Sequence, residues 1–288
     1  MQPASPSDGG EDFRLVCADG RRIAAAAFHP AGAPQLAVLV NPGTAIPRRF
    51  YRYFAAWLAA RGCLVLTYDN RGVGESATGP RDAFLTSDWG VQDQAAAIRW
   101  LTDQADAPVV SVSHSFGTTL MGLCPLVGRL RAVVAVGSHY FRRHELPLAY
   151  RLKQRYDRHL RLPWHLWRRG AYTTPGVDFT MPPEAAREMM RWQFRRYFFS
   201  DQPHHPEHPH FAEMHCPLRH YVISDDAMVP ERQARALVAL YPNARSETLL
   251  LEPQRFGVAE IGHFGFFRKS APEALWQETL DWLHEASR

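Results

Sequence analysis

The chain has 288 residues, of which 46% are apolar and 22% are charged, and its formal net charge is +4 at pH 7. This composition is typical of a globular protein and excludes disordered, fibrous and collagen-like chains. Because no run of 18 uncharged apolar residues occurs, the sequence predicts neither a transmembrane helix nor stable membrane insertion. The start is polar and lacks the basic and apolar stretches of a secretory signal, so residues 1–12 are predicted to be a disordered tail.

Two strands and a turn are predicted first, followed by alternating strands and helices. Residues 13–16 and 23–28 flank Ala18-Asp-Gly-Arg21, whose central Asp-Gly favours a β-hairpin. Continuous apolar runs then predict strands buried on both faces of a parallel sheet, at 36–40, 63–68, 109–113 and 132–137. Helical apolar spacing predicts helices at 50–61, 89–104 and 115–127, the second of them with Ser87 or Asp88 as its N-cap.

The alternation stops at residues 138–209, which are rich in Trp, Tyr, Phe, Arg and Pro. It returns with strands at 218–224 and 246–251 and with helices at 231–240 and 271–286. A hairpin followed by repeated strand–helix units predicts an α/β fold with a mostly parallel central sheet and flanking helices. We therefore predict an α/β core at 13–137 and 210–288, with a helical cap insertion at 138–209.

The predicted cap carries most of the positive charge. It contains 13 Lys and Arg against seven Asp and Glu, so the rest of the chain is slightly acidic. Such a segment attracts an acidic substrate or an anionic membrane surface, or it is only a solvated face. We predict no nucleic-acid partner, and the sequence does not indicate an oligomeric state.

The four cysteines favour a reducing compartment. Cys17, Cys63, Cys124 and Cys216 form no CxxC pair, which argues against zinc ribbons and thioredoxin chemistry. Cys63 and Cys124 lie in apolar segments and are predicted to be buried thiols. A cytoplasmic location is therefore expected.

The segment after strand 109–113 carries the strongest sign of chemistry. Ser113-His-Ser115-Phe-Gly117 is a small-x-Ser-x-Gly pattern between a strand and a helix, as in a nucleophile elbow, although serine replaces the usual first glycine. The pattern predicts Ser115 as the nucleophile and the backbone N–H of Phe116 as a donor to an oxyanion. Taken alone, so short a motif also fits a strand–turn–helix junction without catalysis.

A nucleophilic serine needs a base and a carboxylate that orients the base. Asp225 and Asp226 follow strand 218–224, at the sheet edge where α/β folds present functional groups, and a simple N-cap is the other interpretation of either. His263 is flanked by glycines and aromatic residues in the loop before the last helix, and is predicted to be the base. The chain order Ser, Asp, His is that of α/β-hydrolase triads.

The loop after strand 36–40 is predicted to supply the second oxyanion donor. In Asn41-Pro-Gly-Thr44 the glycine permits close approach of the backbone to a substrate. The N–H of Thr44 is the candidate donor, and that of Ala45 is the alternative.

Together these segments resemble the α/β-hydrolase superfamily and, more narrowly, the bacterial predicted hydrolases called serine aminopeptidase-like. The resemblance covers nearly the whole chain after about residue 13, and implies a serine triad, a cap and no cofactor. In the family's D-x-x-V-P pattern the acid stands four residues before the proline, which is the place of Asp226 before Pro230, while Asp225 remains the alternative. The matching segments are Asn41-Pro-Gly-Thr44, Arg49-Phe-Tyr-Arg52, Tyr68-Asp-Asn-Arg-Gly-Val-Gly-Glu-Ser76, the Ser115 elbow, Arg191-Trp-Gln-Phe-Arg-Arg-Tyr-Phe-Phe199 and Ile261-Gly-His-Phe-Gly-Phe-Phe-Arg268.

Two other motifs are predicted not to bind a cofactor or a metal. Gly72-Val-Gly-Glu-Ser-Ala77 fits a dinucleotide fingerprint, but Thr78-Gly-Pro80 breaks the helix that the fingerprint needs, so an ordered loop is expected in which Asp69 and Arg71 make internal polar contacts. His204-His-Pro-Glu-His-Pro-His210 is interrupted by prolines and is expected to be a surface connector.

Other aromatic and imidazole side chains near the predicted site have structural and functional interpretations. His114 is expected to pack under the elbow. The aromatic residues of the predicted cap are expected either to form its core or to line a substrate pocket: Trp164, Trp167, Trp192, Phe194, Tyr197, Phe198 and Phe199.

The predicted function is that of a serine hydrolase that cleaves an ester or thioester of a small, apolar acyl group through an acyl-enzyme. An amide or small peptide is a less favoured substrate, and a serine nucleophile argues against a dehalogenase. The alternatives are an acyltransferase with the same triad, a non-catalytic binding protein that retains the fold, and a membrane-surface function of the basic cap.

Overall fold

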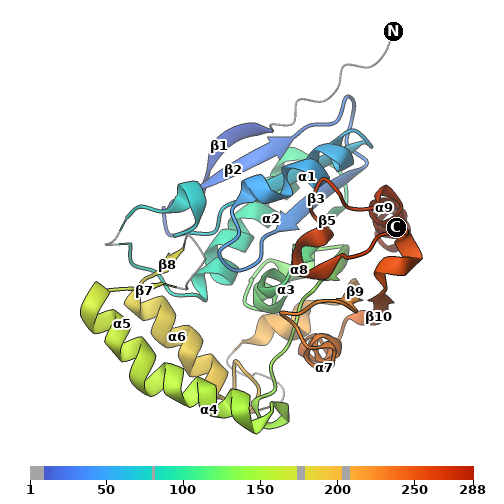
Figure 1. The fold of residues 1–288 in the computed structure, drawn as a ribbon. Helices are drawn as coiled ribbons and strands as arrows, with labels where there is room; N and C mark the ends of the chain where they lie inside the picture. The colour runs from blue at the N-terminus through green and yellow to red at the C-terminus, as the bar shows by residue number, and fades with distance from the viewer. Residues whose placement is uncertain (1–9, 80–81, 174–178, 203–207) are drawn as a thin grey trace.

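Eight strands form one sheet in the computed structural model, which describes residues 10–79, 82–173, 179–202 and 208–288 (Figure 1). Their spatial order is β1-β2-β4-β3-β5-β6-β9-β10. The bounds are β1 (Glu11–Val16), β2 (Arg22–Phe28), β3 (Leu36–Asn41), β4 (Cys63–Tyr68), β5 (Val109–His114), β6 (Ala132–Val136), β9 (Pro217–Ile223) and β10 (Arg245–Leu251).

The sheet is mostly parallel. β1 and β2 form the predicted antiparallel hairpin, and β2 is also antiparallel to β4. All other pairs are parallel, so β3, β5, β6 and β9 end at the same edge of the sheet. Every residue of β3 to β6 is buried, which explains why these strands are continuous apolar runs.

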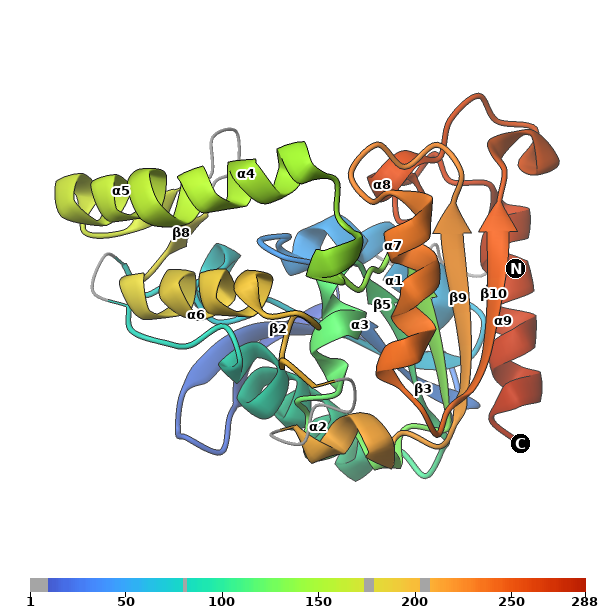
Figure 2. The same ribbon diagram turned by 90° about the horizontal axis from the view of Figure 1, so that it is seen from below.

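Helices cover both faces of the sheet (Figure 2). α1 (Arg52–Ala59) and α9 (Glu273–Ala286) share one core cluster, in which Phe54 packs on Trp276. α2 (Ala95–Gln104) and α3 (Phe116–Met121) belong to the cluster on the other face. Two short helices, α7 (Glu231–Arg235) and α8 (Gly262–Gly265), follow β9 and β10.

Within its described residues, the chain between β6 and β9 adds three α-helices and a short hairpin. α4 (Leu148–Tyr156) continues through a π-helical turn (Asp157–Arg161) into α5 (Leu162–Arg169), and β7 (Tyr172–Thr173) pairs with β8 (Thr180–Met181) before α6 (Pro183–Phe194). Figure 2 shows α4 and α5 in line along the outer edge of the molecule, with α6 beneath them. Within the described ranges, no helix has the length and apolarity needed to cross a bilayer.

Several element boundaries differ from the prediction. β1 begins at Glu11 instead of residue 13, while residues 1–9 of the predicted tail lie outside the described residues. The helix predicted at 115–127 ends at Met121, because Gly122 lies against the Phe211 ring. The N–H groups of Leu123 and Cys124 each donate to the carbonyl oxygen three residues earlier, which closes the helix with a tight turn.

Asp88 stands at the predicted N-cap position of the second helix, but no side-chain capping bond forms there. The helix begins with a π-helical turn (Trp89–Gln94), and neither candidate side chain caps it. The Ser87 hydroxyl donates to Glu188 on α6, and the Asp88 carboxylate accepts from the Leu85 N–H. The Ser87 hydroxyl is therefore engaged in a tertiary contact and does not cap the helix.

Two buried arginine–aspartate pairs hold the loop after β4, as the sequence predicts for Asp69 and Arg71. Asp69 accepts from the Arg48 guanidinium at 2.8 Å. Arg71 donates to Asp93 at 2.8 Å and to Asp19 at 2.8 Å. At the glycines of this loop the chain forms only a single 3-10 turn (Gly74–Ser76). The loop therefore does not provide the helix N-terminus that a dinucleotide fingerprint uses to bind a phosphate.

Candidate active site

The turn between β5 and α3 presents Ser115 in a strained conformation. Its φ of 51° and ψ of −123° lie outside the regions that L-residues usually adopt. A small residue is needed two positions later because a Cβ on Gly117 would lie 2.6 Å from the Pro42 carbonyl oxygen. This close approach of α3 to the loop after β3 explains the small-x-Ser-x-Gly pattern.

The three residues predicted as nucleophile, base and acid lie in one hydrogen-bonded chain. His263 Nε2 is 3.1 Å from Ser115 Oγ, and His263 Nδ1 is 2.7 Å from Asp226 Oδ2. Because the carboxylate can only accept, Nδ1 carries the proton and Nε2 is left to accept from the serine hydroxyl. The three side chains follow β5, β9 and β10, whose carboxyl ends the parallel sheet places at the same edge.

The two neighbouring aspartates have different partners. Asp226 also accepts from the N–H groups of Met228 and Val229, at 2.8 and 3.0 Å. Asp225 does not face the imidazole, and instead accepts from the N–H groups of Ile261 and Gly262 at 3.0 Å each. Asp225 therefore braces the loop that carries His263, whereas Asp226 contacts the ring itself.

The environment of Asp226 favours its ionised form. Its side chain is 2% exposed, and this burial raises the pKa of the carboxyl. The hydrogen bond and charge of His263, together with the two backbone N–H donors, outweigh burial and hold the pKa of Asp226 below its usual value. The acid is thus a carboxylate at neutral pH, as the orienting role requires.

A buried pair under the site was not predicted to have a role. Tyr51 accepts from the Gly43 N–H at 3.0 Å, and its hydroxyl lies 3.0 Å from His114 Nδ1. The other nitrogen of His114 is 2.9 Å from the carbonyl oxygen of His263. The pair therefore connects the loop after β3 to the backbone of the candidate base, and the only sequence sign was that Tyr51 lies in a segment matching the family.

The candidate oxyanion donors come from the start of α3 and from the loop after β3. Phe116 is the first residue of α3, so its N–H has no acceptor within the helix. Gly43 already donates its N–H to Tyr51, which leaves Thr44 and Ala45 as candidates in that loop. The positive φ of Ala45, 60°, marks a local distortion there. The sequence alternative between Thr44 and Ala45 remains open.

A pocket of about 390 Å³ reaches the loops that flank the hydrogen-bonded chain, although Ser115, Asp226 and His263 are not among the residues that line it. Thr44 and Ala45 line it on one side, next to Gly43, where an added Cβ would be 3.3 Å from that of Ser115. Met228, two residues after Asp226, lines it on another side. The remaining wall comes from α4 to α6 and is largely flexible and apolar, with Tyr150, Leu162, Tyr172, Phe179, Met181, Met189 and Met190.

The charged side chains of this wall form ion pairs with one another. Asp157 pairs with both Lys153 and Arg161, at 2.8 and 3.3 Å. Gln154 is 5% exposed, and its Oε1 has no hydrogen-bond partner within the described part of the chain. A bound molecule therefore meets mainly methionine and aromatic surface, with Oε1 of Gln154 and the amide of Gln193 among the polar groups.

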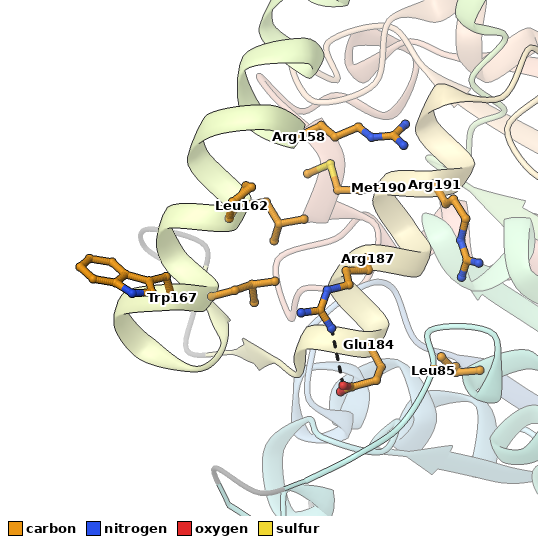
Figure 3. Close-up of a pocket in the computed structure, with 10 residues that line it drawn as sticks. Leu85, Arg158, Leu162, Trp167, Glu184, Arg187, Met190 and Arg191 are labelled. Atoms are coloured by element: carbon orange, nitrogen blue, oxygen red, sulfur yellow. Dashed lines mark ion pairs between the residues drawn. The ribbon is translucent and has the colours of Figure 1, made fainter.

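The aromatic residues that were expected either in the cap core or in a pocket divide between buried and exposed positions. Trp192, Phe198 and Phe199 are buried in the core, and Trp164 is exposed. Trp167 lies at a larger hollow of about 840 Å³ between α5 and α6, whose walls include none of Thr44, Ala45 and Met228 (Figure 3).

No group of three or more metal-binding side chains occurs within the described ranges. His204 and His205 of the histidine-rich segment lie outside the described residues, and His210 pairs with Glu213. All four cysteines are free thiols, and Cys63 and Cys124 are buried as predicted.

Buried histidines are expected to make the fold acid-sensitive. Burial lowers the pKa of His114 and of His220 to about 3, well below the value near 6.5 expected in the unfolded chain. The unfolded state therefore binds more protons below pH 6.5, and the free energy of unfolding should fall by about 2 kcal/mol per histidine between pH 7 and pH 5. Urea denaturation at the two pH values checks this.

A His220→Gln variant supplies the control for that measurement. It removes one of the three histidines, His114, His139 and His220, whose pKa burial lowers to about 3, and should reduce the loss of stability between pH 7 and pH 5 by about one third. Equal stability of the unsubstituted protein at both pH values would contradict the assigned burial effect.

A model of the alpha/beta hydrolase family matches residues 37–278 of the chain. No curated protein sequence matches it. A soluble variant of monoglyceride lipase from Saccharomyces cerevisiae has a TM-score of 0.69 at 13% identity, with 100% of this chain and 97% of that chain covered. DcsB in complex with its substrate analogue has a TM-score of 0.68 at 14% identity, covering 96% and 98%.

A thermophilic esterase from Thermogutta terrifontis is also similar, with a TM-score of 0.60 at 17% identity over 97% of this chain and 100% of that chain. These likenesses confirm the predicted fold, a mostly parallel eight-stranded sheet flanked by helices.

Proposed function

Because the chain belongs to the alpha/beta hydrolase family, we propose that it is a serine hydrolase in which Ser115, His263 and Asp226 form a catalytic triad. The observation that carries the proposal is the hydrogen-bonded chain from Ser115 Oγ through both nitrogens of His263 to Asp226. The family supports hydrolase activity, and the triad and its substrate are our inference from the geometry.

In this mechanism Ser115 Oγ attacks a carbonyl carbon while His263 Nε2 takes the hydroxyl proton. The oxyanion that forms is stabilised by the N–H of Phe116 and by that of Thr44, with Ala45 as the alternative. His263 returns the proton to the leaving alcohol or thiol, and Asp226 stabilises the imidazolium. A water molecule activated by His263 then attacks the acyl-enzyme and releases the acid.

An ester or thioester with an apolar acyl group is the substrate we propose. The pocket beside Ser115 is lined mainly by methionines and aromatic side chains, which adapt to flexible apolar groups. An aminopeptidase would need a carboxylate for the free amino group of its substrate. Asp157 is the one carboxylate among the described residues of this wall and is already paired with two cations. This supports an ester over the substrate that the serine aminopeptidase-like resemblance would suggest.

The helices between β6 and β9 would act as the cap of this enzyme. α4 to α6 supply most of the pocket wall, so the residues of the segment 138–209 would decide which acyl groups fit. The four free thiols support a cytoplasmic location.

A substrate panel tests this proposal. p-Nitrophenyl butyrate and hexanoate, a butyryl thioester and leucine p-nitroanilide would be compared by kcat/KM at pH 7.5. The esters are expected to exceed the anilide by about 100-fold or more. Preference for the anilide would favour a peptidase, transfer of the acyl group to added glycerol in place of water would favour an acyltransferase, and binding of esters without turnover would favour a non-catalytic protein.

A further inference from the structure

Six large apolar side chains are exposed along the outer edge of the helix pair α4–α5. They recur at intervals of four, four, four, four and three residues, and their exposure ranges from 47% for Trp164 to 83% for Trp167. We call this set the outer stripe; its residues are Leu148, Leu152, Tyr156, Leu160, Trp164 and Trp167.

The helix geometry keeps the outer stripe on one side. An α-helix has 3.6 residues per turn, so a four-residue step runs slightly past a full turn and the stripe would drift around the axis. The π-helical turn Asp157–Arg161 holds more residues per turn and reverses part of that drift. The opposite side is buried, with Gln154, Leu162 and His165, so the two faces are distinct.

The outer stripe lies away from the rest of the protein. Figure 2 shows α4 and α5 as the outermost helices, and Figure 3 shows the Trp167 ring pointing away from α6. A helix of this kind, with Trp and Leu on one side and cations beside them, has the composition of helices that lie in a membrane interface.

The charge of the helix pair indicates the chemistry of its partner. Residues 148–169 contain seven Arg and Lys and a single carboxylate, Asp157, which is buried and paired with Lys153 and Arg161. Arg155 and Arg168 are exposed beside the outer stripe. A second copy of the chain would bring the same positive charge against itself, whereas anionic lipid headgroups would neutralise it.

We propose that the helix pair α4–α5 docks on an anionic lipid surface, with the outer stripe entering the interface and the flanking arginines contacting headgroups. Docking in this orientation places the inner side of the same helices, which lines the pocket beside Ser115, directly behind the membrane surface. The inference does not depend on the hydrolase function, because it rests on the outer stripe and its charges.

Vesicle co-sedimentation tests the proposal. The full chain would be mixed with vesicles of phosphatidylcholine alone or with phosphatidylglycerol added. Binding is expected only with phosphatidylglycerol, and is expected to weaken at high salt. The triple variant Leu160→Ser, Trp164→Ser and Trp167→Ser should lower the partition coefficient at least about tenfold, and Arg155→Gln with Arg168→Gln should lower it about 30-fold.

The matched control is Val16→Ser, an exposed apolar residue on β1 outside the outer stripe, with 57% exposure. It should bind vesicles as the unsubstituted chain does, and circular dichroism should show that all variants fold. Absence of binding to anionic vesicles, or binding that the triple variant leaves unchanged, would overturn the proposal. A dimer that the triple variant dissociates, without vesicle binding, would assign the outer stripe to a second copy instead.

Discussion

Replacement of Ser115 by alanine is expected to reduce kcat for p-nitrophenyl butyrate by about 10⁶-fold, because the nucleophile that forms the acyl-enzyme is removed. The fold should persist, since the change deletes one oxygen atom and leaves α3 and its neighbours in contact. Steady-state kinetics at pH 7.5, with circular dichroism as the fold control, measure this.

Ser113→Ala is the matched control for that experiment. Ser113 is another buried serine, two residues earlier and within β5, and its hydroxyl lies 2.8 Å from that of Ser111 instead of facing His263. This variant should keep most of its activity. Equal activity of Ser115→Ala and Ser113→Ala would contradict the assignment of the nucleophile.

Replacement of Asp226 by asparagine is expected to lower kcat by about 10⁴-fold. An asparagine amide can donate to Nδ1 as well as accept from it, so it stabilises the tautomer that leaves a proton on Nε2, where the hydroxyl of Ser115 needs an acceptor. The imidazolium that forms during the reaction also loses its counter-charge. The measurement is kcat at pH 7.5 with the same ester.

Asp225→Asn separates this effect from a general disturbance of the loop. Asp225 accepts two backbone N–H bonds from the segment before His263 and does not contact the ring. We expect a loss of activity of about tenfold or less, together with a lower unfolding temperature. A larger activity loss for Asp225→Asn than for Asp226→Asn would reverse the assignment of the acid.

The sheet could be predicted because burial determines its sequence. Parallel strands covered on both faces must be apolar throughout, so β3 to β6 stand out as continuous runs. The close approach of Gly117 to Pro42 similarly imposes a small residue that a sequence pattern detects. The carboxyl ends of the parallel strands share one edge of the sheet. Ser115, Asp226 and His263 each follow a strand, so they could be predicted to lie together.

Features made by contacts distant in sequence were not predictable in this way. The wall of the pocket beside Ser115 combines Met181, Met189 and Met228 from separate elements, and no local pattern brings methionines together. The helix after Ser115 ends early because Phe211, far along the chain, packs against Gly122. The link from Tyr51 through His114 to the His263 carbonyl likewise joins three separate segments.

The outer stripe shows a different limit of sequence reasoning. Its four-residue spacing suits a buried or an exposed helix face equally well, and only the exposure of Trp164 and Trp167 in the folded chain decides between the two. The same aromatic residues were expected in the cap core or in the pocket. Because these residues lie on the outer edge, we expect them to contact a lipid surface instead of the acyl group of a substrate.

The most direct test of the central claim is covalent labelling of the folded protein with a fluorophosphonate probe, followed by intact-mass measurement. The account predicts one adduct per chain, located at Ser115 by peptide mapping and missing from Ser115→Ala, because only an activated serine attacks the phosphorus at neutral pH. An adduct that persists in Ser115→Ala, or a folded protein that takes up no probe, would contradict it.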